Sequence, residues 1–248
     1  MRVQCATYNG HLGEGQSVLP NQSGKEEVEL ASWLNATLAR DGKGESEAPD
    51  LVAVGFQEMI PLVRVLLALS ASRASCSFLR GEVQHLALAG FTSTALGLHE
   101  EKLKTAIEET HTREKGSRET YSLVGRKSLG GIALLLYSND RTLTSKVKNV
   151  QVSTAGCGIL NLMGNKGAVG IRLGLKGEEE SWTFVTAHLA AHQEQVERRN
   201  RDWREIVQRL VFVDQGGEGR ERGLYETGNL FVFGVSLSLV NLPSLHLY

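Results

Sequence analysis

The sequence predicts an α/β fold in which mixed β-sheets are flanked by helices. Apolar runs of strand length alternate with amphipathic helical segments in the first half of the chain. From residue 121 onward, strand-like segments follow one another without an intervening helix for about sixty residues. The 248 residues, of which 41% are hydrophobic and 22% charged, can bury a sizeable core, most simply as one large domain.

Eight short segments have the composition of strands, with apolar runs bounded by Gly, Asn, Asp or Ser. They are residues 3–8, 51–56, 121–124, 132–137, 147–152, 168–175, 182–187 and 230–233. Residues 51–56 are a continuous apolar run, which is typical of a strand buried on both faces. Gln57 and Glu58 follow directly, so they sit where a buried strand ends, a usual position for site residues in α/β folds.

Helices are expected where apolar residues recur at helical spacing or a helix-start signal is present. They are residues 26–40, 61–69, 102–109 and 193–212. Pro61 suits the first turn of the second of these helices. A further strand is expected near Phe91, and residues 216–228 are expected to form a polar loop.

Charge and cysteine content argue against several classes of function. A formal net charge of −1 gives no general electrostatic grip on nucleic acid or on an acidic membrane. The three cysteines are far apart and include no Cys-x-x-Cys pair, which indicates neither a disulfide framework nor a zinc site. No signal peptide or spanning segment is evident, so we expect a protein that is cytoplasmic or peripheral at a membrane.

The richest chemistry lies in the turn Gly164-Asn165-Lys166-Gly167 and in the strand end at His188. The turn brings backbone amides and an ammonium to one point, and the strand places an imidazole beside it. This arrangement favours phosphate binding. The alternative for the turn is a plain β-hairpin with a solvated lysine.

Four stretches, in this order, resemble the inositol polyphosphate 5-phosphatases of the endonuclease/exonuclease/phosphatase superfamily. They are Thr7-Tyr8-Asn9-Gly10, Gly55-Phe56-Gln57-Glu58, Gly164 to Val169, and His188 to Trp203. The resemblance implies a deoxyribonuclease I-like sandwich of two packed sheets with helices outside. It also implies a Mg²⁺-dependent phosphoric monoester hydrolase that removes the 5-phosphate from phosphoinositides or inositol phosphates and takes no nucleic acid partner.

The resemblance implies catalytic roles for Glu58, His188 and Asn9, with Glu58 as the metal ligand and Asn9 supporting metal or phosphate. It implies substrate contacts for Asn165, Lys166, Arg199 and Asn200. The alternatives are a helix cap for Glu58, a turn residue in Asn9, and a solvated helix face that includes Arg199. For His192, which has zinc-like i,i+4 spacing from His188, a structural role is equally open.

The resemblance stops after Gly234. Where the family continues into Asp-x-Asn-Tyr-Arg, this chain has Val235-Ser236-Leu237, and no later Ser-Asp-His segment follows. We expect a partial phosphatase-like domain over residues 1–234, incomplete at its C-terminal end and nearly inactive, followed by a divergent apolar tail over residues 235–248. A non-catalytic phosphoinositide-binding or scaffold protein is the first alternative. A nuclease of the same superfamily is the second, disfavoured by the near-zero charge.

Overall fold

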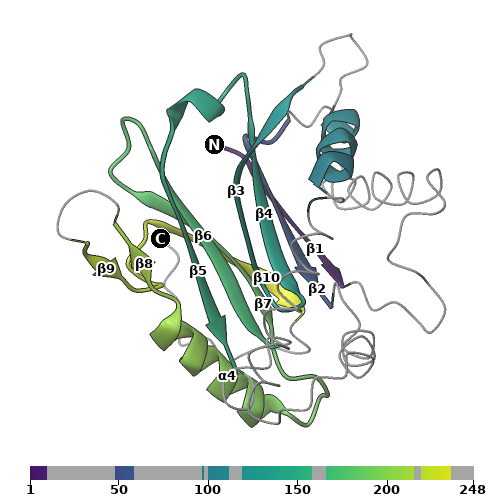
Figure 1. Ribbon diagram of the computed structural model, residues 1–248, viewed down its shortest axis with the longest axis vertical. Coiled ribbons are helices and arrows are strands. Elements are labelled where there is room, and N and C mark those ends of the chain that lie inside the picture. The colour runs from purple at the N-terminus through teal and green to yellow at the C-terminus, as the bar shows by residue number, and fades with distance from the viewer. Residues whose placement is uncertain are drawn as a thin grey trace, which may run out of the picture.

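The computed structural model describes residues 1–9, 48–58, 97, 100–111, 119–157, 166–214 and 219–235. These residues form two four-stranded sheets packed face to face, with a helix on the outer face of each (Figure 1). The predicted α/β sandwich of two mixed sheets is therefore confirmed. The helices expected at residues 26–40 and 61–69 and the strand near Phe91 lie outside the described residues.

The first sheet has the strand order β1-β2-β4-β3. Its strands are β1 (Val3–Asn9), β2 (Leu51–Gln57), β4 (Ile132–Asn139) and β3 (Tyr121–Leu129). β1 runs parallel to β2, and the other neighbours are antiparallel. Every residue of β2 and β4 is buried, because both faces of these central strands are covered.

The second sheet has the order β10-β7-β6-β5. Its strands are β10 (Asn229–Val235), β7 (Ser181–His188), β6 (Gly167–Leu175) and β5 (Val147–Gly156), the last preceded by the short 3₁₀ helix η2 (Thr144–Lys146). β10 runs parallel to β7, and the remaining pairs are antiparallel. All eight predicted strands are present, each somewhat longer than its apolar run.

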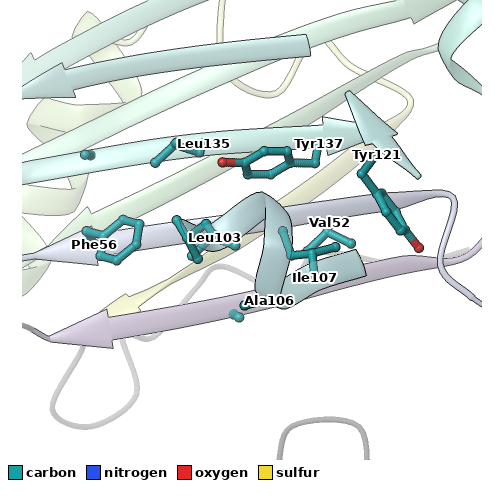
Figure 2. Close-up of a cluster of buried hydrophobic side chains, with 11 residues drawn as sticks. Val52, Phe56, Leu103, Ala106, Ile107, Tyr121, Leu135 and Tyr137 are labelled. Atoms are coloured by element: carbon teal, nitrogen blue, oxygen red, sulfur yellow. The ribbon is translucent and has the colours of Figure 1, made fainter. Parts of the chain in front are cut away.

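Alternate residues of each strand face two separate cores. Leu51 and Ala53 of β2 face the second sheet and pack in one cluster with Ile171 and Phe184. The intervening residues of β2 face outward toward a helix over residues 100–111. Figure 2 shows this outer cluster, in which Leu103, Ala106 and Ile107 of the helix meet Val52, Phe56, Leu135 and Tyr137 of the sheet.

The outer face of the second sheet is covered by α4 (Val196–Arg209) and by a short hairpin. The hairpin pairs β8 (Phe212–Val213) with β9 (Glu221–Arg222). The prediction of one helix over residues 193–212 was therefore too long at both ends, and the expected loop at residues 216–228 contains a strand. Phe212 is fully buried against the sheet. An extended segment can bury this side chain as well as a helix can, so its apolar character did not fix the end of the helix.

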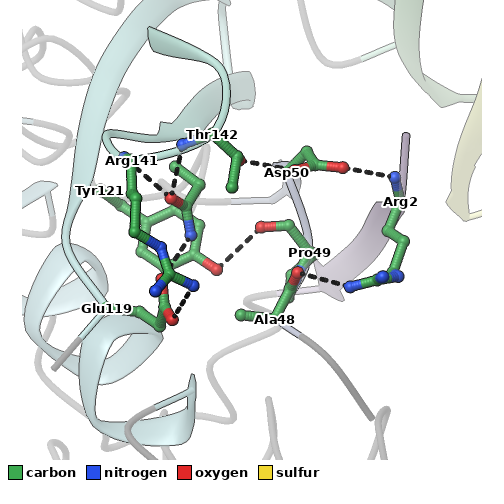
Figure 3. A network of polar contacts seen from close by, with 9 residues as sticks. Arg2, Ala48, Pro49, Asp50, Glu119, Tyr121, Arg141 and Thr142 are labelled. Carbon is green, nitrogen blue, oxygen red and sulfur yellow. Dashed lines mark hydrogen bonds and ion pairs between the residues drawn. The ribbon is translucent and has the colours of Figure 1, made fainter. Parts of the chain in front are cut away.

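A polar network closes the end of the first sheet where β1 and β2 begin (Figure 3). The Asp50 carboxylate accepts hydrogen bonds from the Arg2 amide at 2.8 Å and the Thr142 hydroxyl at 2.5 Å. The Tyr121 hydroxyl donates to the Pro49 carbonyl at 2.9 Å. These contacts tie the start of two parallel strands to the turn after β4. Within the described residues, no helix is long and apolar enough to span a bilayer.

Candidate active site

Five strand ends converge at the opposite edge of the sandwich. β1 ends at Asn9 and β2 at Gln57, which are paired in register, and Glu58 follows Gln57. β7 ends at His188, whose register partners are Val235 at the end of β10 and Gly167 at the start of β6. The two parallel pairs therefore deliver their carboxyl ends to one place, where α/β folds commonly carry their sites.

Lys166, His188 and Glu58 lie together at this edge. Lys166 Nζ is 2.6 Å from His188 Nε2. His188 Nε2 is in turn 3.5 Å from Glu58 Oε1. The His188 side chain is 4% exposed and that of Glu58 is 35% exposed. A lysine ammonium has only donors, so His188 Nε2 accepts its hydrogen bond, and the Glu58 carboxylate balances the ammonium charge. The sequence predicted all three residues, and the structure brings them together.

Burial lowers the pKa of Lys166 below its usual value, while the charges of Glu58 and Asp202 act in the opposite direction. A half-buried ammonium is an effective binder of an incoming phosphate, because it has already lost much of its hydration. The turn is not the whole β-hairpin connection, since β5 ends at Gly156 and β6 begins at Gly167. Lys166 is the last residue of a longer link, and Asn165 lies outside the described residues.

Glu58 has a left-handed backbone conformation, with φ of 54°. Non-glycine residues adopt this conformation infrequently, and it is enriched at functional sites. The chain therefore turns sharply as it leaves β2, with the Glu58 carboxylate held near His188. The alternative of a plain helix cap concerns residues from 59 onward, which lie outside the described residues.

Two threonines that the sequence did not single out join the sheets beneath the site through Gln57. The Thr7 hydroxyl donates to Gln57 Oε1 at 2.9 Å, and Gln57 Nε2 donates to the Thr186 hydroxyl at 2.7 Å. Gln57 is fully buried. Thr7 lies two positions before Asn9, and Thr186 lies two positions before His188. Residues two apart in a strand point to the same face, so each threonine shares the face of its site residue. That spacing was the available signal.

Arg199 and Asn200 lie on α4, beside the loop that follows His188. Arg199 is 1% exposed, and its guanidinium donates to the carbonyls of Ala190, His192 and Gln193. The solvated-face alternative is therefore wrong for Arg199. Asn200 is half-buried, and its Oδ1 accepts no hydrogen bond within the described part of the chain.

His192 does not form an i,i+4 pair on a helix with His188. It is exposed, has φ of 73°, and precedes the first residue of α4, Val196. Among residues 1–9, 48–58, 97, 100–111, 119–157, 166–214 and 219–235, no three His, Cys, Asp or Glu side chains form a ready metal site. Glu58 and the exposed Asn9 supply one carboxylate and one amide oxygen. That pair fits Mg²⁺, which takes few protein ligands and keeps several waters.

Comparison with known proteins identifies the family of this chain. Residues 7–235 match the model of Endonuclease/Exonuclease/phosphatase family 2. Human Synaptojanin-2 is 30% identical over 75% of this chain, and mouse Type II inositol 1,4,5-trisphosphate 5-phosphatase is 34% identical over 66%. The chain spans only 10% and 13% of the lengths of these two relatives.

A solved structure shares the fold. It is the inositol polyphosphate 5-phosphatase domain of SPsynaptojanin, in complex with inositol (1,4)-bisphosphate and a calcium ion. The match has a TM-score of 0.50 at 22% identity and covers 78% of this chain and 44% of that one. The chain therefore belongs to the endonuclease/exonuclease/phosphatase family 2 and is related within it to the inositol polyphosphate 5-phosphatases.

Proposed function

We propose that this chain is a domain of the Mg²⁺-dependent inositol polyphosphate 5-phosphatase type, whose substrates are phosphoinositides or soluble inositol phosphates. The observation that carries the proposal is the group of Lys166, His188 and Glu58 at the edge where both sheets end. It brings an ammonium, an imidazole and a carboxylate together at one place. The relatives' names and the ligand of the solved domain support the same substrate class.

Each residue has a distinct role in this proposal. Glu58 and Asn9 hold the metal, and a bound Mg²⁺ supplies charge neutralisation for the phosphate oxygens. Lys166 binds the phosphate through its ammonium. The proton shared between Lys166 Nζ and His188 Nε2 is available to an oxygen of the scissile phosphate. The relay from Thr7 through Gln57 to Thr186 keeps the two halves of the site in register.

Turnover by this sequence is expected to be slow. Val235 pairs in register with His188. By the resemblance, the Asp of Asp-x-Asn would stand at position 235. Loss of one member of a cooperating catalytic group typically lowers the rate by orders of magnitude. The chain is therefore proposed to bind its substrate at a cytoplasmic membrane surface or in solution and to hydrolyse it poorly.

The test is Mg²⁺-dependent phosphate release from phosphatidylinositol 4,5-bisphosphate in detergent micelles. The double variant Val235→Asp with Leu237→Asn is expected to release phosphate faster than the unaltered chain, and adding Glu58→Ala is expected to abolish the gain. Calorimetry with inositol 1,4-bisphosphate gives a second readout. The unaltered chain is expected to bind this ligand, and Lys166→Ala is expected to weaken the binding. A chain that neither binds the ligand nor releases phosphate would overturn the proposal.

A non-catalytic phosphoinositide-binding protein is the second candidate, favoured by Val235 itself. It predicts the same binding and the same loss with Lys166→Ala. It differs in the double variant, which would stay inactive if the site were not otherwise that of a phosphatase. The pair of experiments therefore separates a phosphatase site in which Val235 replaces an acid from a recognition module.

A further inference from the structure

We propose that Asp202 and Arg199 are positioning residues that hold His188 and Lys166 at hydrogen-bond distance, and that Arg199 acts through the backbone and not by contacting phosphate. The inference deepens the proposed function, because the residues it positions are those proposed to bind phosphate. Both side chains belong to α4 and are almost fully buried, Asp202 at 2% exposure and Arg199 at 1%.

The first half of the argument concerns the loop after His188. Asp202 Oδ2 accepts a hydrogen bond from the Ala190 amide at 3.2 Å, and Arg199 Nη1 donates to the Ala190 carbonyl at 3.3 Å. Arg199 also donates to the carbonyls of His192 and Gln193. Ala190 is two residues beyond His188. α4 therefore holds the backbone that follows β7 through both the amide and the carbonyl of Ala190.

The second half concerns the segment that carries Lys166. The Cys157 amide donates to the Lys166 carbonyl at 3.0 Å, so these two residues move together. Cys157 in turn is held by α4. Its thiol donates to the Asp202 carbonyl at 3.3 Å, and Arg198 Nη2 lies 3.5 Å from the Cys157 carbonyl. Arg198 Nε also donates to Asp202 Oδ1 at 3.0 Å. Asp202 thus contacts the backbone after His188 directly. It contacts the segment that carries Lys166 through Cys157 and Arg198.

The geometry of Arg199 argues against a direct phosphate contact. To reach a phosphate, its guanidinium would have to leave the carbonyls of Ala190, His192 and Gln193 and give up three hydrogen bonds from a charged donor that is itself 1% exposed. A planar guanidinium can serve several carbonyls at once, whereas a lysine ammonium is a single point of charge. Arg199→Lys therefore separates the two roles, because it keeps the charge and loses the shape.

The first experiment observes His188 without any ligand. NMR spectra of the full chain with labelled histidine are recorded for the unaltered protein and for Lys166→Met, which removes the contact to Nε2. Asp202→Ala and Arg199→Lys are expected to move the His188 ring signals in the direction of Lys166→Met. Asp202→Asn retains an acceptor for the Ala190 amide and is expected to restore most of the original position. Arg204→Ala, an exposed arginine of the same helix, is the matched control and is expected to change nothing.

The second experiment measures binding of inositol 1,4-bisphosphate with Mg²⁺ by calorimetry. Lys166→Met and Arg199→Lys are each expected to weaken binding about tenfold, the loss of one charge-assisted hydrogen bond. The double variant is expected to bind no more weakly than Lys166→Met alone, because both changes remove the same contact. Additive losses, or full retention of affinity in Arg199→Lys, would overturn the positioning role.

The two experiments also separate this inference from the proposed function. If the unaltered chain binds no inositol phosphate, the proposed function fails, and the His188 signals still report on positioning. If Asp202→Ala does not fold, Asp202→Asn and Arg199→Lys carry the test. Unmoved His188 signals in folded Arg199→Lys and Asp202→Ala would reject the inference even if inositol phosphate binds.

Discussion

Gly55 shows how one residue sets the distance between the two sheets beneath the site. A Cβ at this position would lie 2.3 Å from Thr186 Oγ1 and 2.8 Å from the Phe233 ring. Thr186 is not free to move away, because its hydroxyl accepts the hydrogen bond from Gln57. Only glycine lets β2 approach the second sheet closely enough for that hydrogen bond.

Gly55→Ala is therefore expected to lower the free energy of unfolding by about 1–3 kcal/mol, the usual cost of overpacking a buried position. Urea denaturation measures the change. Gly97→Ala is the matched control, since nothing lies within 4 Å of its added Cβ and the residue is helical. It is expected to raise stability by about 0.5–1 kcal/mol. A Gly55→Ala protein as stable as the original would contradict the close packing.

His111 provides a second prediction at this scale. Its ring packs against Tyr121, and Nε2 lies 3.1 Å from Gln4 Oε1. Burial lowers the pKa of His111 from 6.5 to about 4, with the Glu119 charge acting in the opposite direction. The unfolded chain therefore binds a proton at this residue near pH 6.5, and the folded chain does so only near pH 4.

Between these two pH values the unfolded state holds more protons, so the contribution of His111 to stability is complete above pH 6.5 and is lost as pH falls toward about 4. His111→Gln is expected to flatten this part of the pH dependence. Urea midpoints measured above, within and below the window test the expectation. Parallel curves for the two proteins would show that His111 is not buried in its neutral form.

At the scale of elements, α4 connects packing with the site. Its apolar stripe, including Trp203 and Ile206, packs on the second sheet, while Arg199 and Asp202 hold the loops that carry His188 and Lys166. The helix is therefore both a cover for the core and a support for the site. A helix displaced from the sheet would take the hydrogen bonds to Ala190 and Cys157 with it.

Ile206→Ala is expected to destabilise the protein by about 2–4 kcal/mol, since Ile206 is fully buried and its truncation leaves a cavity. Thermal unfolding monitored by circular dichroism measures the loss. The control is Gln208→Ala, an exposed position two residues further along the same helix. Because alanine is a better helix former than isoleucine or glutamine, helix propensity alone predicts no loss in either variant. An equal loss in both would contradict the assignment of the effect to the docking of Ile206 on the sheet.

At the scale of the whole molecule, the strand order places β10 at one edge of the second sheet within the described part of the chain. An edge strand presents unpaired backbone groups and invites pairing with another chain. Val232 of this strand is 43% exposed, while its neighbours Phe231 and Phe233 face the core between the sheets. Among the described residues, this edge therefore combines backbone groups that have no strand partner with an apolar side chain.

We expect the chain to self-associate and to be poorly soluble when it is expressed alone. Val232→Lys is expected to raise the concentration at which it remains monomeric, because a charge on an edge strand opposes pairing between chains. Sedimentation velocity measures this concentration. Val196→Lys makes the same change on a helix, where Val196 is 39% exposed. Equal improvement in both variants would assign the effect to net charge.

Local patterns in the sequence were sufficient to predict the strands and the ends that carry Glu58 and His188. Residues 51–56 form an unbroken apolar run, and such a run has few other solutions than a strand covered on both faces. The turn at Lys166 and the strand before His188 can likewise be predicted from residues that are adjacent in the sequence. Phe212 marks the limit, because its apolar position fits a helix and an extended segment equally well.

The fold class, the strands and the residue types that suit phosphate binding all follow from the sequence alone. Tertiary structure alone decided which of these groups meet. The contact between Lys166 and His188 depends on the register of β6 against β7, and the one with Glu58 depends on how the sheets pack. The inward turn of Arg199 depends on carbonyls that a helix docked on the sheet encounters. Local periodicity reports burial, but not which distant partner a buried polar group finds.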